Sequence, residues 1–337
     1  MKTILFFLFS VGVANAQISD FKAVDFTQAD HMAKLYEGEG LDNMPALVYK
    51  LTNTLTSPIE KFRAIYMWVC NNIACDINQD NTVTRKRQVF KNDSLGYVNW
   101  NNTYKKKAFK KLLKHNKTMC TGYAYLIKEL CFLAQIDCVI INGYGRTANA
   151  NVESLELVNH SWNAVNLNNK WYLCDATWSS GYNLIGSGFI KSYNDGYFLT
   201  NPELFALNHY PVDKKWLLNN DKKMSEYVLA PLVYGHTFRY GVEPVSPDKL
   251  HVQAIVDDEI DFRFKALNGI NPETLAMVRF VGDDLVKLKI YDVVKEQDQI
   301  SFKCQFKRKG VFDAHLKIND DIIATYVVEV ATNKKSQ

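Results

Sequence analysis

The sequence predicts an α+β domain followed by an all-β domain. Helical patterns come first along the chain, two strands joined by a short polar turn follow, and short alternating runs without helical periodicity occupy the remainder. Helices that precede an antiparallel sheet, rather than alternating with its strands, are typical of the α+β class. We therefore expect a first domain over residues 17–230 and a second over 231–337.

Composition excludes several classes of protein. The chain has 337 residues, of which 47% are hydrophobic and 23% charged, so a disordered protein is not expected. Forty basic and 36 acidic side chains leave a net charge of +4, which is too small to indicate nucleic-acid binding. We expect no nucleic-acid partner.

The N-terminus has the pattern of an export signal. Met1 and Lys2 form a basic start, 4–13 is apolar, and Ala14-Asn15-Ala16 is a small-x-small cleavage site. The apolar stretch is too short to span a bilayer. We expect a signal peptide over residues 1–16, no integral membrane segment, and a secreted or periplasmic protein; an uncleaved apolar helix is the alternative.

Helix signals can be located in the first domain. Ser57-Pro58-Ile59-Glu60 is a capping box with proline at the first helical position, followed by an apolar stripe at helical spacing. Residues 78–102 are polar and unpatterned and are predicted to form a loop, before a lysine-rich helix over 105–117. A further helix follows Thr118, the expected N-cap. A short strand over 138–142 then ends at a Gly-Tyr-Gly break.

The second domain is predicted to be a β-sandwich. Seven short alternating runs, several of them separated by turn signals, are typical of an immunoglobulin-like sandwich. The runs cover 251–256, 260–265, 275–280, 285–291, 300–306, 312–318 and 322–330.

Cys120 is the candidate nucleophile. With Thr118 as N-cap it would be the second residue of a helix, where free amides and the helix dipole favour a thiolate. Gly122 removes bulk where another element must approach. The chain has seven cysteines, an odd number, and we expect several buried thiols rather than three disulfides. A cysteine at a helix start is weak support without a base.

His160 and Asp175 supply the base and its partner. If Asn168-Asn169 closes a two-residue hairpin between strands 157–167 and 170–177, Leu167 faces Lys170, and His160 and Asp175 become diagonal neighbours on one face. An aspartate that accepts one imidazole proton leaves the other nitrogen for a thiol, as in a catalytic triad. In the alternative interpretation, Asp175 only pairs with a backbone amide.

A metal site is the other interpretation of these residue types. No Cys-x-x-Cys or His-x-x-x-His spacing occurs, so we expect no metal and no cofactor. The amide of Cys120 is the expected oxyanion donor, and Trp100 is a second candidate without support from spacing.

Three motifs, in order, resemble those of the transglutaminase-like superfamily. They are Met119-Cys120-Thr121-Gly122-Tyr123-Ala124, His160-Ser161-Trp162-Asn163 and Asp175-Ala176-Thr177-Trp178. The segments 197–205 and 209–211 further resemble the kyphoscoliosis-peptidase branch, and the likeness covers about residues 45–220. Met119 stands where the family often has glycine.

The resemblance implies a papain-like core with Cys120 as nucleophile, His160 as base and acid, and Asp175 as orienter. We expect an enzyme that hydrolyses, or transfers, an amide acyl group of a protein or peptide through a thioester, with hydrolysis slightly favoured. The alternative is an inactive scaffold at the cell envelope that binds a surface partner through its β-sandwich. An N-glycan amidase is a weaker rival, since no carbohydrate signal is seen.

Overall fold

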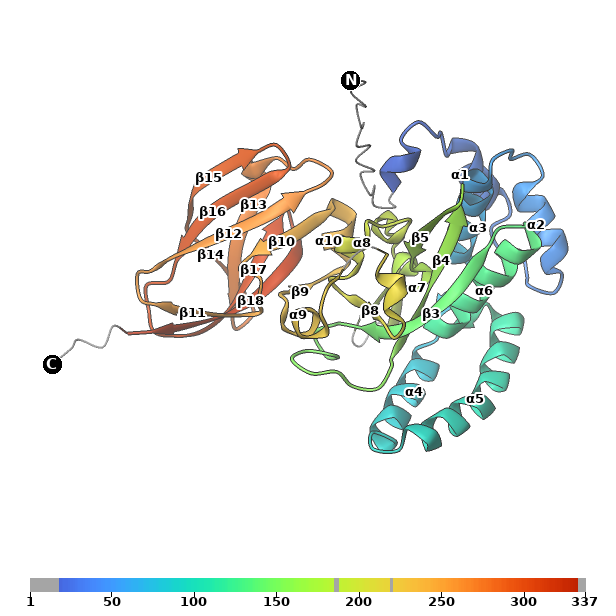
Figure 1. Ribbon diagram of the computed structural model, residues 1–337, viewed down its shortest axis with the longest axis horizontal. Helices are drawn as coiled ribbons and strands as arrows, with labels where there is room; N and C mark the ends of the chain where they lie inside the picture. The colour runs from blue at the N-terminus through green and yellow to red at the C-terminus, as the bar shows by residue number, and fades with distance from the viewer. Residues whose placement is uncertain (1–17, 185–187, 219–220, 333–337) are drawn as a thin grey trace, which may run out of the picture.

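The computed structural model describes residues 18–184, 188–218 and 221–332. A helix-rich body built on a small sheet lies beside a strand-rich body (Figure 1). The predicted signal peptide, residues 1–16, lies outside the described residues. Within the described ranges, none of the helices combines the length and apolarity needed to cross a membrane.

Helices begin the first body, before its main sheet. They are η1 (Ile18–Phe21), α1 (Thr27–Leu35), α2 (Met44–Thr52), α3 (Pro58–Asn72), α4 (Ile77–Val89), α5 (Ser94–His115) and α6 (Cys120–Leu133). Strands β1 (Ala74–Cys75) and β2 (Lys117–Thr118) pair in parallel and bracket α4 and α5. The predicted capping box is confirmed: the Ser57 side chain accepts from the Glu60 amide, and the Glu60 carboxylate accepts from the Ser57 amide at 3.0 Å.

The predicted loop over 78–102 is wrong, because this segment forms most of α4 and the start of α5. Asp76 caps α4 through the Gln79 amide, and Asp93 caps α5 through the Gly96 amide at 2.8 Å. The helices are too polar for apolar periodicity to show them. The predicted helix over 105–117 is the second half of α5. Figure 1 shows the two helices projecting from the body as a hairpin.

A four-stranded antiparallel sheet in the order β5-β4-β3-β8 forms the centre of the first body. Its strands are β3 (Cys138–Gly145), β4 (His160–Leu167), β5 (Lys170–Cys174) and β8 (His209–Pro211). Strand β3 continues through the predicted Gly-Tyr-Gly break. Gly143 pairs with both β4 and β8, and Gly145 pairs with β8. Strand β4 contributes to two hydrophobic clusters. Val165 packs in the cluster that contains α3 and α6, and Trp162, on the other face of the strand, packs in a second cluster.

The predicted hairpin register is confirmed from Leu167 with Lys170 to Asn163 with Cys174. Asn168 and Asn169 have φ of 54° and 61°, the left-handed conformation that a type I′ turn requires. Strand β5 ends at Cys174, however, so the predicted strand to residue 177 is too long. The chain turns at Asp175 into a short helix instead.

Short elements connect the sheet to the second body. They are α7 (Ala176–Ser180), β6 (Gly181–Leu184), β7 (Gly188–Lys191), η2 (Asp195–Tyr197), α8 (Pro202–Phe205), η3 (Lys214–Leu217), α9 (Met224–Leu229), β9 (Leu232–Val233) and α10 (Gly235–Tyr240). Strand β9 pairs with the last strand of the sandwich. The domain limits 17–230 and 231–337 stay predictions.

The second body is the predicted β-sandwich, with sheets in the orders β10-β12-β16-β15 and β11-β18-β17-β13-β14. Phe262 and Phe302 of one sheet pack with Tyr326 of the other in the core between them. The predicted run 285–291 is divided between β14 and β15, and β10 was not predicted. The elements are β10 (Val242–Ser246), β11 (His251–Ile255), β12 (Glu259–Ala266), η4 (Pro272–Thr274), β13 (Leu275–Val281), β14 (Asp284–Leu288), β15 (Ile290–Glu296), β16 (Gln299–Gln305), β17 (Gly310–Ile318) and β18 (Asp321–Ala331).

Candidate active site

Cys120 is the first residue of α6, one position earlier than predicted. The N-cap is Met119, and it makes no side-chain capping bond; the predicted N-cap, Thr118, instead ends β2 opposite Cys75. A Cβ on Gly122 would lie 1.8 Å from Thr118 Oγ1, so glycine allows β2 to pass this close to the helix. The amide of Cys120 has no acceptor within the helix, as expected for a first helical residue.

His160 begins β4 and meets both predicted partners. Its Nε2 lies 2.8 Å from Asp175 Oδ2, and the ring lines the same cleft as the Cys120 thiol, near enough to lower the pKa of that thiol. The ring stacks on Trp178 with centroids 4.4 Å apart and planes 18° from parallel. Since Asp175 occupies Nε2, Nδ1 is the nitrogen available to Cys120. The structure therefore brings the three predicted residues together.

Asp175 is the N-cap of α7 and is fully buried. Its Oδ1 accepts hydrogen bonds from the amides of Thr177 at 2.8 Å and Trp178 at 3.4 Å. Its Oδ2 faces His160, so the carboxylate pairs with backbone amides and with the imidazole at once. The expected proximity of Asp175 to His160 is confirmed, but a helix cap places the carboxylate rather than a strand position.

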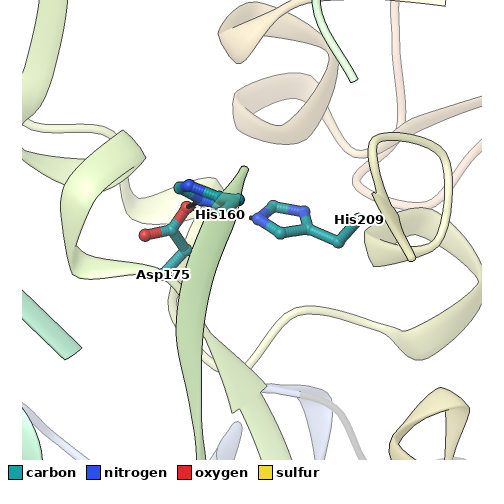
Figure 2. A group of neighbouring side chains, drawn as sticks. All are labelled: His160, Asp175 and His209. Atoms are coloured by element: carbon teal, nitrogen blue, oxygen red, sulfur yellow. Dashed lines mark hydrogen bonds and ion pairs between the residues drawn. The ribbon is translucent and has the colours of Figure 1, made fainter. Parts of the chain in front are cut away.

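A second imidazole, absent from the predicted site, reaches the same carboxylate oxygen. His209 on β8 places its Nε2 3.2 Å from Asp175 Oδ2, beside the ring of His160 (Figure 2). Sequence reasoning noted this residue only within a family-like tripeptide. No local spacing could indicate it, because 34 residues separate it from Asp175 and a three-residue strand joins it to the sheet.

The charges of the site favour an ion pair. Burial would raise the pKa of the Cys120 thiol, but the hydrogen bond and charge of His160, with the charge of Arg87, bring that pKa below its ordinary value. Burial opposes a charge on His160 too, yet Asp175 raises the pKa of His160 to about 10. Burial is likewise outweighed at Asp175, whose pKa is held well below its usual range by His160 and His209. These shifts favour the thiolate of Cys120 and the imidazolium of His160.

A cleft of about 480 Å³ opens at Cys120 and His160. It runs between the α4–α5 hairpin and the segment that precedes β4, and it presents the charged side chains of Arg87, Lys105 and Glu156. Arg87 Nη2 donates to the carbonyl of Asn159 at 3.1 Å, and the sulfur of Cys120 lies 4.0 Å from the same oxygen. The guanidinium therefore lies near the thiol.

Two further candidate groups lie at the site. Trp100 packs on the cluster that contains Met119 and Cys120 and stacks on Tyr104 at 4.9 Å. The ligand atoms of His160, Asp175 and His209 lie within 4.8 Å of one another, which is close enough for a metal ion. An ion there would replace the two hydrogen bonds that Oδ2 accepts. The absence of a metal stays a prediction.

The fold and the site define a cysteine-centred domain with a histidine and an aspartate behind the thiol. Residues 45–176 match the transglutaminase-like superfamily, and the chain is similar to kyphoscoliosis peptidases. The matched range includes Cys120, His160 and Asp175, and His209 lies beyond it.

Three relatives illustrate this similarity. The kyphoscoliosis peptidase of Homo sapiens is 33% identical over 60% of this chain, and that of Mus musculus is 34% identical over 51%. Hillarin of Drosophila melanogaster is 26% identical over 65%. The matches span only 27%, 24% and 26% of these relatives, so the chain corresponds to about a quarter of their length. A solved structure titled "Crystal structure of a TGase" matches 48% of this chain and 35% of its own at 15% identity, with a TM-score of 0.27, too low to bear on the fold.

Proposed function

We propose that the chain is a cysteine enzyme that hydrolyses, or transfers, an amide acyl group of a protein or peptide through a thioester on Cys120. The observation that carries the proposal is the line of contacts from Asp175 through His160 to a thiol at the start of a helix. Helix start, imidazole and carboxylate all favour the reactive thiolate. The adjoining cleft gives a substrate carbonyl access to the sulfur.

The chemistry follows from this geometry. The Cys120 sulfur attacks the amide carbonyl, and the amide of Cys120 donates to the oxygen that gains negative charge. The His160 imidazolium then gives its Nδ1 proton to the departing nitrogen, so an amine or ammonia leaves and a thioester remains. Water or a second amine, deprotonated by the now neutral His160, attacks the thioester and restores the thiol. Asp175 holds the imidazole in the required tautomer throughout.

The water and amine routes give different products. The protein would be incubated with an unfolded protein substrate and a fluorescent primary amine, and ammonia, new N-termini and incorporated amine would each be measured. We expect Cys120→Ser to abolish every product, with hydrolysis products exceeding incorporated amine in the parent. Absence of all products from the parent across a broad substrate set would favour the alternative, a scaffold whose β-sandwich binds a surface partner.

We propose, as a separate point, that the chain is exported to the periplasm or the exterior. The basic start, apolar stretch and small-x-small site of residues 1–16 support this. Intact-mass measurement of the protein made in its native host should give a chain that begins at Gln17. A mature chain that retains Met1 would contradict the proposal.

A further inference from the structure

His209 is enclosed by aromatic rings and yet makes polar contacts at both ring nitrogens. Its side chain has no exposed surface, and its ring stacks on Phe205 with centroids 3.8 Å apart. Trp178 and Trp162 close two other sides at 4.4 and 5.0 Å. With no surface exposed to solvent, each ring nitrogen has a protein group as its polar neighbour.

The neighbours of His209 determine its tautomer. Burial lowers the pKa of His209 to about 4, so the ring is neutral and carries one N–H. The groups that face it are Asp175, His160, the Asn208 amide and the backbone carbonyl of Phe205. Ionised Asp175 can only accept, so its contact with Nε2 is a hydrogen bond only if Nε2 carries the proton, in which case Nδ1 is the acceptor.

The contact of Nδ1 with Asn208 then orients a longer chain of hydrogen bonds. As placed, Asn208 Oδ1 lies 2.7 Å from Nδ1, and Asn208 Nδ2 lies 3.3 Å from the Tyr197 hydroxyl. An amide keeps its shape when its oxygen and nitrogen exchange places. The Asn208 NH₂ must therefore face His209, and the Tyr197 hydroxyl can donate to the Asn208 oxygen. Donation runs in one direction, from Tyr197 to Asp175.

We propose that His209 is a positioning residue for the thiol–imidazole pair: as the neutral Nε2–H tautomer it donates the fourth hydrogen bond to the Asp175 carboxylate. Two amides donate to Oδ1, while His160 and His209, whose ring centroids lie 5.3 Å apart, both contact Oδ2. The carboxylate is thereby fixed in its orientation toward His160 and kept ionised although it is fully buried. This inference rests on the proposed function and extends the site from three residues to four.

Two substitutions separate hydrogen bonding from packing. His209→Phe keeps a ring among the aromatic neighbours and removes the donor, whereas His209→Gln places an NH₂ near the position of Nε2. Without the fourth donor a buried carboxylate takes up a proton more easily, and His160 loses its charged partner. We expect the acidic limb of Cys120 alkylation by iodoacetamide to move upward by about one to two pH units in His209→Phe. His209→Gln should restore most of the parent behaviour.

The tautomer provides a test that needs no variant. In ¹⁵N spectra of the parent, His209 should show a protonated Nε2 and a bare Nδ1 between pH 5 and 8, and a protonated Nδ1 would overturn the inference. The inference would also be overturned if Cys120 alkylation had the same pH dependence in the parent and in His209→Phe, provided that thermal unfolding shows both proteins to be folded. Stoichiometric metal in the purified protein whose removal changes the His209 signals would overturn it too. An unreactive Cys120 in the parent would instead count against the proposed function, because the spectra do not depend on reactivity.

Discussion

Replacing Asp175 with asparagine tests how far one carboxylate holds the site together. Asparagine keeps the Oδ1 acceptor for the amides of Thr177 and Trp178, so the cap of α7 survives. Its NH₂ group, however, would face the Nε2 atoms of His160 and His209, which lie 2.8 and 3.2 Å from Oδ2 in the parent. An NH₂ donor would then face the N–H donors of the two rings among buried side chains.

The expected loss of stability is large. Removing one partner of a buried ion pair lowers the free energy of unfolding by about 3–5 kcal/mol. The low pKa of Asp175 stabilises the folded chain above the unfolded pKa of about 3.9, and this contribution is lost as pH falls further. The raised pKa of His160 stabilises the folded chain below the unfolded pKa of about 6.5, and this contribution is lost as pH rises toward 10. The difference between parent and variant should therefore be greatest between about pH 4 and 6.5.

Urea unfolding at pH 5.5 and pH 2.5 measures this difference. Asp80→Asn is the control, since Asp80 is a half-buried carboxyl of α4 whose pKa is raised by burial, so that its charge adds little stability. We expect at least 3 kcal/mol lost in Asp175→Asn at pH 5.5, a smaller loss at pH 2.5, and less than about 1 kcal/mol in the control. A loss under about 1 kcal/mol at pH 5.5 in Asp175→Asn would refute the reasoning.

Three other predictions follow from particular contacts. Arg87→Gln should move the onset of Cys120 alkylation to higher pH by about half to one unit, because the charge of Arg87 favours the thiolate. Arg87→Lys keeps that charge and should keep the parent onset, so equal shifts in the two variants would contradict this prediction. Gly122→Ala should lower the free energy of unfolding by about 1–3 kcal/mol through the clash with Thr118, whereas Gly40→Ala, whose Cβ meets only the end of a flexible side chain, should change it little; thermal unfolding decides. A fragment from residue 231 onward should give a β-type circular dichroism spectrum by itself, since its sheets enclose their own core, and an unfolded fragment would mean that both bodies share one core.

Local rules of the sequence were enough for part of the fold. Ser57 and Glu60 marked the start of α3, and Asn168-Asn169 defined the register of β4 and β5, because both features depend on residues close in the chain. The place of Asp175 followed from that register only approximately, since the helix cap takes over where β5 ends.

Other parts depend on contacts between distant segments. Helix α4 and the start of α5 could not be predicted because their sequences are as polar and charged as those of a typical loop. The two helices are stabilised by their caps and by aromatic packing along α5. Thr118 looked like an N-cap but serves β2, which pairs with a strand more than forty residues earlier. His209 reaches Asp175 only through the pairing of β8 with β3.

The central claim is that Cys120 is held as a reactive thiolate, and the seven cysteines of the chain allow a direct test. All seven are free thiols. Cys75 is half-buried, whereas Cys120 is buried. Burial raises the pKa of Cys75 to about 11, however, whereas His160 lowers that of Cys120. Iodoacetamide labelling followed by peptide mass spectrometry from pH 5 to 9 should therefore modify Cys120 first, with His160→Ala shifting its reactivity toward alkaline pH. Labelling of Cys75 ahead of Cys120 near neutral pH, with an unchanged Cys120 response in His160→Ala, would contradict the account.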